Sequence, residues 1–121
     1  MDDQIHVICE VEITLRVIGG KWKPLILHYL QLNGSRRYMD ILRYLGTAPK
    51  KTLTAQLKEL EADGVLSRTV IPTVPIQVEY AVTEYGKTLF PILDAMCDWG
   101  WDHRGDRYVL SHPACDCGEE P

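Results

Sequence analysis

The chain has 121 residues, of which 45% are hydrophobic and 25% are charged. This is the length and composition of one globular domain, which argues against a two-domain enzyme. Its longest nearly uninterrupted apolar stretch, Pro24 to Leu30, is far shorter than the roughly 20 residues that span a bilayer, so we expect no membrane segment. The acidic start is unlike a secretory signal, and together with four cysteines it favours a cytoplasmic protein with reduced thiols.

The net charge of −4 hides an uneven distribution of charged residues. Between Lys21 and Arg68 there are nine basic and four acidic residues, whereas the rest of the chain has four basic and thirteen acidic ones. A basic centre can attract phosphate groups while the acidic ends repel them. Nucleic acid therefore stays among the expected partners despite the negative total.

Four helices are predicted in the first half of the chain. A short apolar run over 11–18 ends at Gly19 and Gly20, a pair that is costly inside a helix. Hydrophobic residues then recur at helical spacing over 22–33, 38–45 and 49–63. Each of these segments stops at a glycine, which is typical of a helix end.

The hydrophobic period then changes to that of β-strands. Segments 65–71 and 78–82 are rich in branched residues, and Pro72 and Pro75 between them predict a hairpin with a proline-stiffened tip. Thr83 as N-cap and an apolar stripe from Tyr85 to Trp99 predict a long last helix with a kink at Pro91. Beyond this helix the chain turns polar, so we predict one domain over 1–101 and a tail over 102–121.

The order of these elements is typical of a winged helix. We predict a mostly α fold with a small β-hairpin, a winged helix-turn-helix with additional dimerisation helices at its N- and C-terminal ends. In this fold, helix 49–63 lies in the DNA major groove and the hairpin contacts the DNA backbone. Placing Leu53, Leu57 and Leu60 inward makes the opposite side of helix 49–63 small, hydroxylated and basic. That side consists of Lys51, Ala55, Lys58 and Ala62, flanked by Thr52, Thr54 and Glu59.

A run of lysines on a helix can also be a solvated surface without a partner. The positions favour DNA, because the pairs Arg36–Arg37 and Lys50–Lys51 stand at predicted helix starts. Cations there oppose the helix dipole but add to the N–H groups that bind phosphate. The predicted DNA-contacting residues are Arg36, Arg37, Lys50, Lys51, Thr52, Thr54, Ala55, Lys58 and Arg68.

With these motifs in place, the chain resembles the HxlR-type transcriptional regulators, small winged-helix proteins related to the MarR group. The matching residues are Val17 to Trp22, Arg36 to Tyr38, Lys51 to Thr54, Leu57 to Glu61, Asp63 to Val65, Pro75, Val78 to Tyr80, Thr83 and Gly86. Two positions depart from the family pattern: Glu10 replaces a proline after Cys9, and Pro49 replaces a common serine. The resemblance implies a homodimer that binds near-palindromic double-stranded operator DNA.

The apolar residues of the first and last helices exceed what a small core needs to cover. This excess predicts that both helices bury a two-fold interface between subunits. The predicted interface residues are Val11, Ile13, Leu15, Leu89, Ile92, Leu93, Met96 and Trp99.

Cys9 matches in position the reactive N-terminal cysteine of redox-responsive relatives. A helix N-terminus stabilises a thiolate, whereas Glu10 and Glu12 would oppose it, and packing in the dimer contact is the alternative role. We expect Cys97, next to the apolar stripe of the last helix, to pack in the core. Likewise, His28 is expected at the edge of the core.

The tail contains Cys115 and Cys117, with His112 close by. A single residue between two cysteines makes a poor zinc clamp, so the metal hypothesis is the weaker one. A redox-labile pair and a tail without any role are the other interpretations.

Taken together, these patterns predict a dimeric DNA-binding transcriptional regulator that responds to thiol-reactive or redox signals. We expect neither enzymatic activity nor a cofactor, because no nucleophile with a base, phosphate loop or zinc-hydrolase motif is present. Two alternatives stay open: a winged-helix module that binds protein, and a metal-responsive regulator that uses Cys115, Cys117 and His112.

Overall fold

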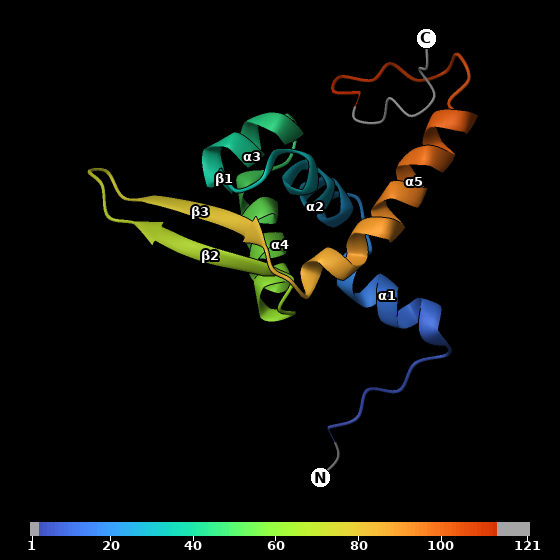
Figure 1. Ribbon diagram of the computed structural model, residues 1–121, viewed down its shortest axis with the longest axis horizontal. Helices are drawn as coiled ribbons and strands as arrows, with labels where there is room; N and C mark the ends of the chain where they lie inside the picture. Colours follow the sequence, from blue (N-terminus) through green and yellow to red (C-terminus); the bar gives the residue numbers. More distant parts are fainter. Residues whose placement is uncertain (1–2, 114–121) are drawn as a thin grey trace.

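The structure is a computed structural model that describes residues 3–113, in which α-helices pack at the base of a small antiparallel sheet whose hairpin projects away from them (Figure 1). In chain order the elements are α1 (Glu10–Ile18), α2 (Trp22–Asn33), β1 (Arg36–Arg37), α3 (Tyr38–Leu45), α4 (Lys50–Ala62), β2 (Leu66–Ile71), β3 (Gln77–Val82), the short 3₁₀ helix η1 (Gly86–Leu89) and α5 (Phe90–His103). The winged-helix fold class predicted from the sequence is confirmed.

The first four predicted helices and the hairpin are confirmed to within one residue at each end. Strands β2 and β3 pair in antiparallel register, from Leu66 opposite Val82 to Ile71 opposite Gln77. Gly64 takes the left-handed conformation (φ +82°) that ends α4 and directs the chain into β2. Glycine avoids the steric penalty that a side chain would meet there.

The prediction of one long last helix with a kink at Pro91 was wrong. The Thr83 hydroxyl accepts a hydrogen bond at 2.9 Å from the N–H of Gly86, the first residue of the 3₁₀ turn η1, whose N-cap is Tyr85, so Thr83 does not cap α5. Helix α5 begins at Phe90, so Pro91 lies in its first turn. A proline there removes an N–H group that has no helical partner in any case, and the helix needs no kink.

The sequence did not reveal strand β1, which pairs with β3 and completes a sheet in the order β1–β3–β2. In this pairing Arg36 lies opposite Tyr80 and Arg37 opposite Glu79. A strand of two residues is too short to show the alternation that marks a strand in a sequence. The arginine pair therefore lies at the sheet edge directly before α3, and Arg37 stands at the start of that helix as predicted.

The hydrophobic core lies where α2, α3 and α4 meet the base of the hairpin. Its largest fully buried side chains are Ile26, Leu27, Ile41, Leu53, Leu57, Leu60 and Val65. Burying one such side chain contributes roughly 1.5 to 3 kcal/mol. The inward placement of the three leucines of α4 is thereby confirmed.

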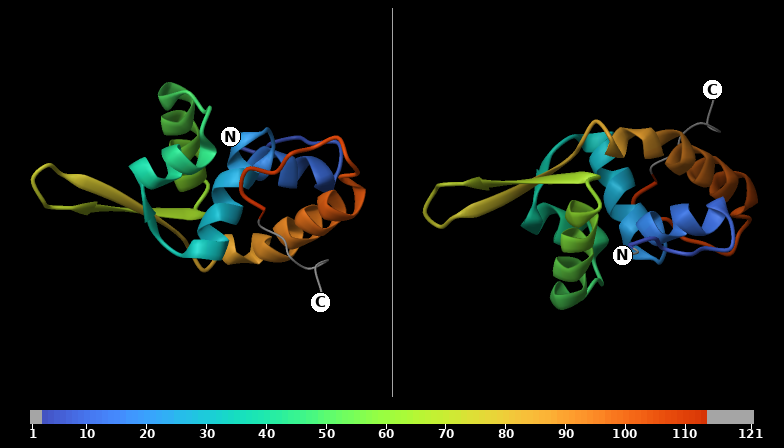
Figure 2. Two further views of the ribbon diagram at one scale, coloured as in Figure 1. Left: turned by 90° about the horizontal axis from the view of Figure 1, so that it is seen from above. Right: turned by 90° about the horizontal axis from the view of Figure 1, so that it is seen from below.

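The hairpin and helix α4 lie at one end of the molecule, and α1 and α5 lie at the other (Figures 1 and 2). Helix α2 runs between the two ends and contacts α3, α4 and α5. None of the helices within residues 3–113 is long and apolar enough to cross a membrane.

Candidate nucleic-acid interface

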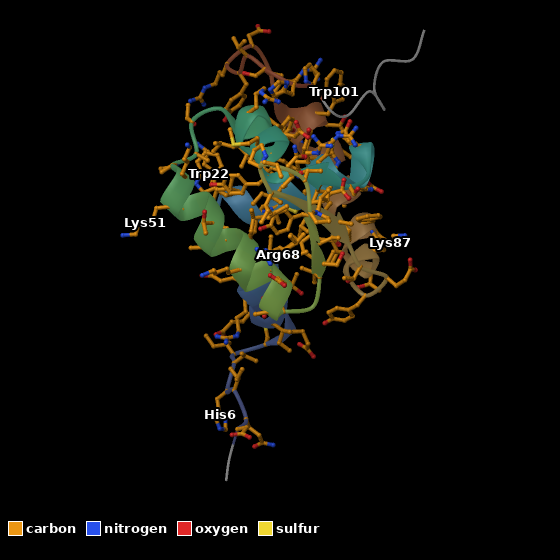
Figure 3. All side chains as sticks on the ribbon, turned by 90° about the vertical axis from the view of Figure 1, so that its left-hand side faces the viewer. His6, Trp22, Lys51, Arg68, Lys87 and Trp101 are labelled. Carbon is orange, nitrogen blue, oxygen red and sulfur yellow. The ribbon has the colours of Figure 1, made fainter. Side chains whose placement is uncertain are left out.

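Helix α4 presents a polar, cationic face on the side opposite its buried leucines. Lys51, Ala55 and Lys58 are exposed on this face, and Thr52 at its edge is half-buried. Figure 3 shows Lys51 pointing away from the body of the protein. Small and basic side chains allow a helix to approach base edges and phosphates closely.

A cleft of about 830 Å³ lies between α3, α4 and the hairpin. Four cationic side chains line it, against two carboxylates: Arg37, Arg43, Lys58 and Arg68, with Asp40 and Glu61. One cation is already paired, because the Arg43 guanidinium lies 3.1 Å from the Asp40 carboxylate. The net charge of the other charged residues that line the cleft is positive, which suits an anionic ligand.

Contacts from two neighbouring helices fix the position of α4. Lys23 of α2 is buried, and its Nζ lies 2.6 Å from Oε1 of Glu59 on α4. A buried ammonium group is stable only with such a partner. On α3, the Tyr38 hydroxyl lies 3.2 Å from the Thr54 hydroxyl and donates to the Lys50 carbonyl at 3.4 Å. The cationic face is therefore held by rigid neighbours.

The two arginines of β1 have different surroundings. Arg37 is the N-cap of α3, its N–H donates to Asp40 Oδ2 at 3.3 Å, and its side chain lines the cleft. Arg36 is half-buried, and its guanidinium donates to the Ser35 carbonyl at 2.8 Å. It is not among the cleft residues, so the structure brings only one of the pair next to Lys58 and Arg68.

Arg68 lies in the body of the hairpin, opposite Tyr80, and lines the cleft. The hairpin tip itself has no charged residue over 71–76. It is shaped by the Thr73 hydroxyl, which donates to the Pro75 carbonyl at 2.8 Å, and Val74 is fully exposed. Any phosphate contact made by the tip would therefore come from backbone groups.

Several residues that line the cleft were not predicted from the sequence as DNA contacts, among them Tyr38, Met39, Arg43 and Gln77. Of these, Arg43 could have been predicted from the sequence as a DNA contact, because it is a cation on the exposed side of α3. Finding the others requires the pairing of β1 with β3, which brings the start of α3 beside the hairpin.

A second notable surface is the apolar one at the opposite end of the molecule. In α1 only Ile18 is buried, while Val11, Ile13 and Leu15 are exposed. On α5, the side chains of Ile92, Met96 and Trp99 are exposed, and Leu89 of η1 is half-buried. Leu93, by contrast, is buried in the chain's own core, which leaves it no free surface for a partner.

Cys9 is exposed at the N-cap of α1. The Glu12 carboxylate beside it accepts a hydrogen bond from the Ile8 N–H at 2.8 Å. Cys97 on α5 is half-buried, which is less than the core position expected. Cys115 and Cys117 lie outside the described residues.

Within residues 3–113 no group of three or more His, Cys, Asp or Glu side chains could hold a metal ion. His112 stacks on Tyr44 instead, with ring centroids 4.6 Å apart. The hypothesis of a metal site with Cys115 and Cys117 is not tested, since both cysteines fall beyond this range.

His28 on α2 is half-buried, as expected for the edge of the core, and this predicts a pH effect on stability. Burial lowers the pKa of its imidazole, and Asp94 on α5 opposes the shift. As pH falls below about 6.5, the unfolded chain therefore binds the proton first. The contribution of neutral His28 to stability is complete above that pH and is lost as pH falls through the lower pKa of the folded state.

We therefore expect His28→Gln to reduce the fall in the free energy of unfolding between about pH 7.5 and about pH 5.5, measured by urea titration. His6→Gln, in the exposed N-terminal segment, is the matched control and should behave like the parent chain. Equal pH dependence in the parent and His28→Gln would contradict the prediction.

A helix with an exposed cationic face, next to a cation-lined cleft and a protruding hairpin, defines a winged helix-turn-helix protein. Residues 17–108 match the model of the HxlR-like helix-turn-helix family. The chain therefore belongs to this family, and it is a transcriptional regulator.

Known relatives agree with this assignment. The chain is 50% identical over 93 residues to the HTH-type transcriptional regulator YtcD of Bacillus subtilis, covering 77% of this chain and 73% of the relative. Among solved structures, the redox regulator HypR in its oxidized form is 46% identical and superposes with a TM-score of 0.73, covering 84% of this chain and all of that chain. The reduced form of the transcriptional regulator YodB from B. subtilis is 31% identical, with a TM-score of 0.67 over 83% of this chain and 100% of that chain.

Proposed function

We propose that the protein is a homodimer that binds operator DNA with α4 of each subunit in the major groove and the hairpin against the backbone. The observation that carries the proposal is the exposed cationic face of α4, which continues into the cation-lined cleft beside the hairpin. In this interface Lys51 and Lys58 contact phosphates or guanine acceptors, and Arg37 and Arg68 contact the backbone.

The dimer part of the proposal rests on the apolar surface of α1 and α5. Leu15 is 57% exposed and Trp99 is 65% exposed, together with other apolar side chains at the same end of the molecule. Such surfaces on soluble proteins mark interaction sites. A two-fold axis at this end places the two α4 helices on the outside of the dimer, where they reach successive half-sites of a near-palindrome.

A salt titration of DNA binding tests the proposal. With DNA from upstream of the protein's own gene, affinity should fall by about 10³-fold or more between about 50 and about 200 mM salt, because a dimer that contacts six or more phosphates releases their counterions. The absence of any DNA binding at the lower salt concentration would favour a module that binds protein.

The wing supplies a further prediction. Replacing residues 73–75 with glycines removes the hydrogen bond from Thr73 to Pro75 and the fixed shape of the tip. Affinity should then fall by a similar factor for operator and unrelated DNA, because contacts to the backbone carry no sequence information. Competition titrations with both DNAs measure this, and a loss confined to the operator would mean that the wing reads bases.

Cys9 is the thiol that we propose as the sensor of oxidants. It is exposed, and the relatives include a regulator described as a redox regulator. We expect Cys9→Ser to bind the operator like the parent chain but to keep this binding in the presence of diamide. The double variant Cys115→Ser, Cys117→Ser should alter only how readily a reductant restores binding. Oxidant sensitivity retained in Cys9→Ser would exclude Cys9 as the sensor.

A further inference from the structure

Glu59 is a carboxylate at the edge of the cationic face of α4. It lies one helical turn after Ala55, a residue of that face, and such neighbours have Cβ atoms about 5 to 6 Å apart. Its side chain is 56% exposed, so its charge is not hidden from a ligand bound to α4. A negative charge at this place repels the phosphates that Lys51 and Lys58 attract. On its own, Glu59 therefore opposes the function proposed above.

Lys23 on α2 compensates this charge. Its Nζ lies 2.6 Å from Oε1 of Glu59, and the lysine is only 7% exposed. An ion pair with both partners exposed is weakened by water and salt, whereas burial of one partner reduces this screening. The two charges therefore cancel next to the cationic face of α4.

The position of Lys23 is unfavourable for the fold itself. It stands in the first turn of α2, which contains no acidic residue, and a cation there opposes the helix dipole. Burial also removes the hydration of its ammonium group. An apolar side chain of similar length could hold α2 against α4, because hydrophobic residues often replace buried ion pairs without loss of stability. Stability alone therefore does not explain a buried lysine at this position.

The cleft on the other flank of α4 shows a related arrangement of charges. Asp40, which lines it, is paired with Arg43 at 3.1 Å. Glu61, the other carboxylate of the lining, shares the cleft with Lys58 and Arg68. On both flanks of α4, carboxylates are therefore accompanied by cations.

We propose that Lys23 neutralises Glu59 so that DNA phosphates can approach α4. Lys23 acts through Glu59 and does not itself contact DNA, because it is buried. This proposal rests on the function proposed above. It gives the ion pair an electrostatic role in DNA binding, in addition to its role as a contact between two helices.

A double variant separates the electrostatic role from a structural one. Lys23→Met leaves Glu59 uncompensated, so affinity for a duplex from upstream of the protein's own gene should fall by about threefold or more at about 0.1 M salt, where charges act over about 10 Å. Adding Glu59→Gln removes the negative charge, and affinity should return to that of the parent chain. Both variants lack the ion pair between α2 and α4, so a purely structural role predicts no recovery. Gel-shift titrations measure the three affinities.

Two further variants serve as controls. Lys23→Gln removes the same charge but keeps a polar side chain, and it should show the same loss as Lys23→Met. Lys87→Met also leaves a carboxylate without its lysine, because Lys87 pairs with Glu84 at 2.9 Å, but it lies on the other side of the molecule from Lys51 (Figure 3). It should bind DNA like the parent chain. Urea titrations check that each variant folds, as expected because the Glu59 carboxylate left behind is more than half exposed.

Two results would overturn the proposal while the parent chain still binds the duplex. Equal affinity of Lys23→Met and the parent chain would mean that the charge of Glu59 does not act on DNA. A double variant that binds as weakly as Lys23→Met would mean that Lys23 only holds α4 in place. Failure of the parent chain to bind would instead overturn the proposed function, and the role of Lys23 with it.

Discussion

Replacing Met96 with aspartate is expected to yield monomers and to abolish operator binding. Met96 is 49% exposed at the centre of the apolar stripe on α5. In the proposed dimer its side chain is buried against the partner, where an unpaired carboxylate is strongly unfavourable. One subunit alone binds one half-site. Operator affinity should therefore fall by about 100-fold or more, because the two half-sites are no longer bound by two linked subunits.

Light scattering after size exclusion measures the subunit number, and a gel-shift titration measures the affinity. The matched control is Leu32→Asp, because Leu32 is 51% exposed on α2, away from this stripe. It should stay dimeric and bind DNA like the parent chain. A Met96→Asp variant that remains a dimer would place the subunit interface elsewhere.

The second large effect is expected from the lysines of α4. Lys51→Ala and Lys58→Ala should each weaken operator binding and lower the slope of log affinity against log salt by about one unit, since each removes one phosphate contact. Both side chains are exposed, so the free energy of unfolding should change little.

Lys87→Ala is the control for this pair of variants. Lys87 is a half-exposed lysine that pairs with Glu84, and Figure 3 shows it on the other side of the molecule from Lys51. It should leave the salt slope unchanged. If all three variants bind the operator like the parent chain at moderate salt, α4 does not form the DNA face.

The parts of the fold that could be predicted are those with long, regular patterns. The buried leucines of α4 at positions 53, 57 and 60 recur at helical spacing, and this spacing also defined its opposite, cationic face. The branched residues of β2 and β3 around two prolines defined the hairpin in the same way. Local pattern and tertiary packing agree in these elements.

The features that could not be predicted depend on tertiary contacts. Strand β1 is too short to show a period and exists because β3 pairs with it, so the arginine pair was predicted only as the start of a helix and not as part of a sheet. Thr83 was expected to cap the last helix, but the 3₁₀ turn η1 lies between Thr83 and α5, and this placed Pro91 in the first turn of α5 and not at a kink. The salt bridge from Lys23 to Glu59 joins two helices and leaves no local signal.

In the proposed complex, the two α4 helices of one dimer lie in successive major grooves of an operator. Footprinting of the bound operator with a reagent that modifies guanines in the major groove tests it most directly. We expect two protected segments whose centres lie about 10 to 10.5 base pairs apart, or a multiple of this spacing, and we expect Lys51→Ala to weaken protection of both alike. Protection of one segment only, or of minor-groove positions alone, would contradict it.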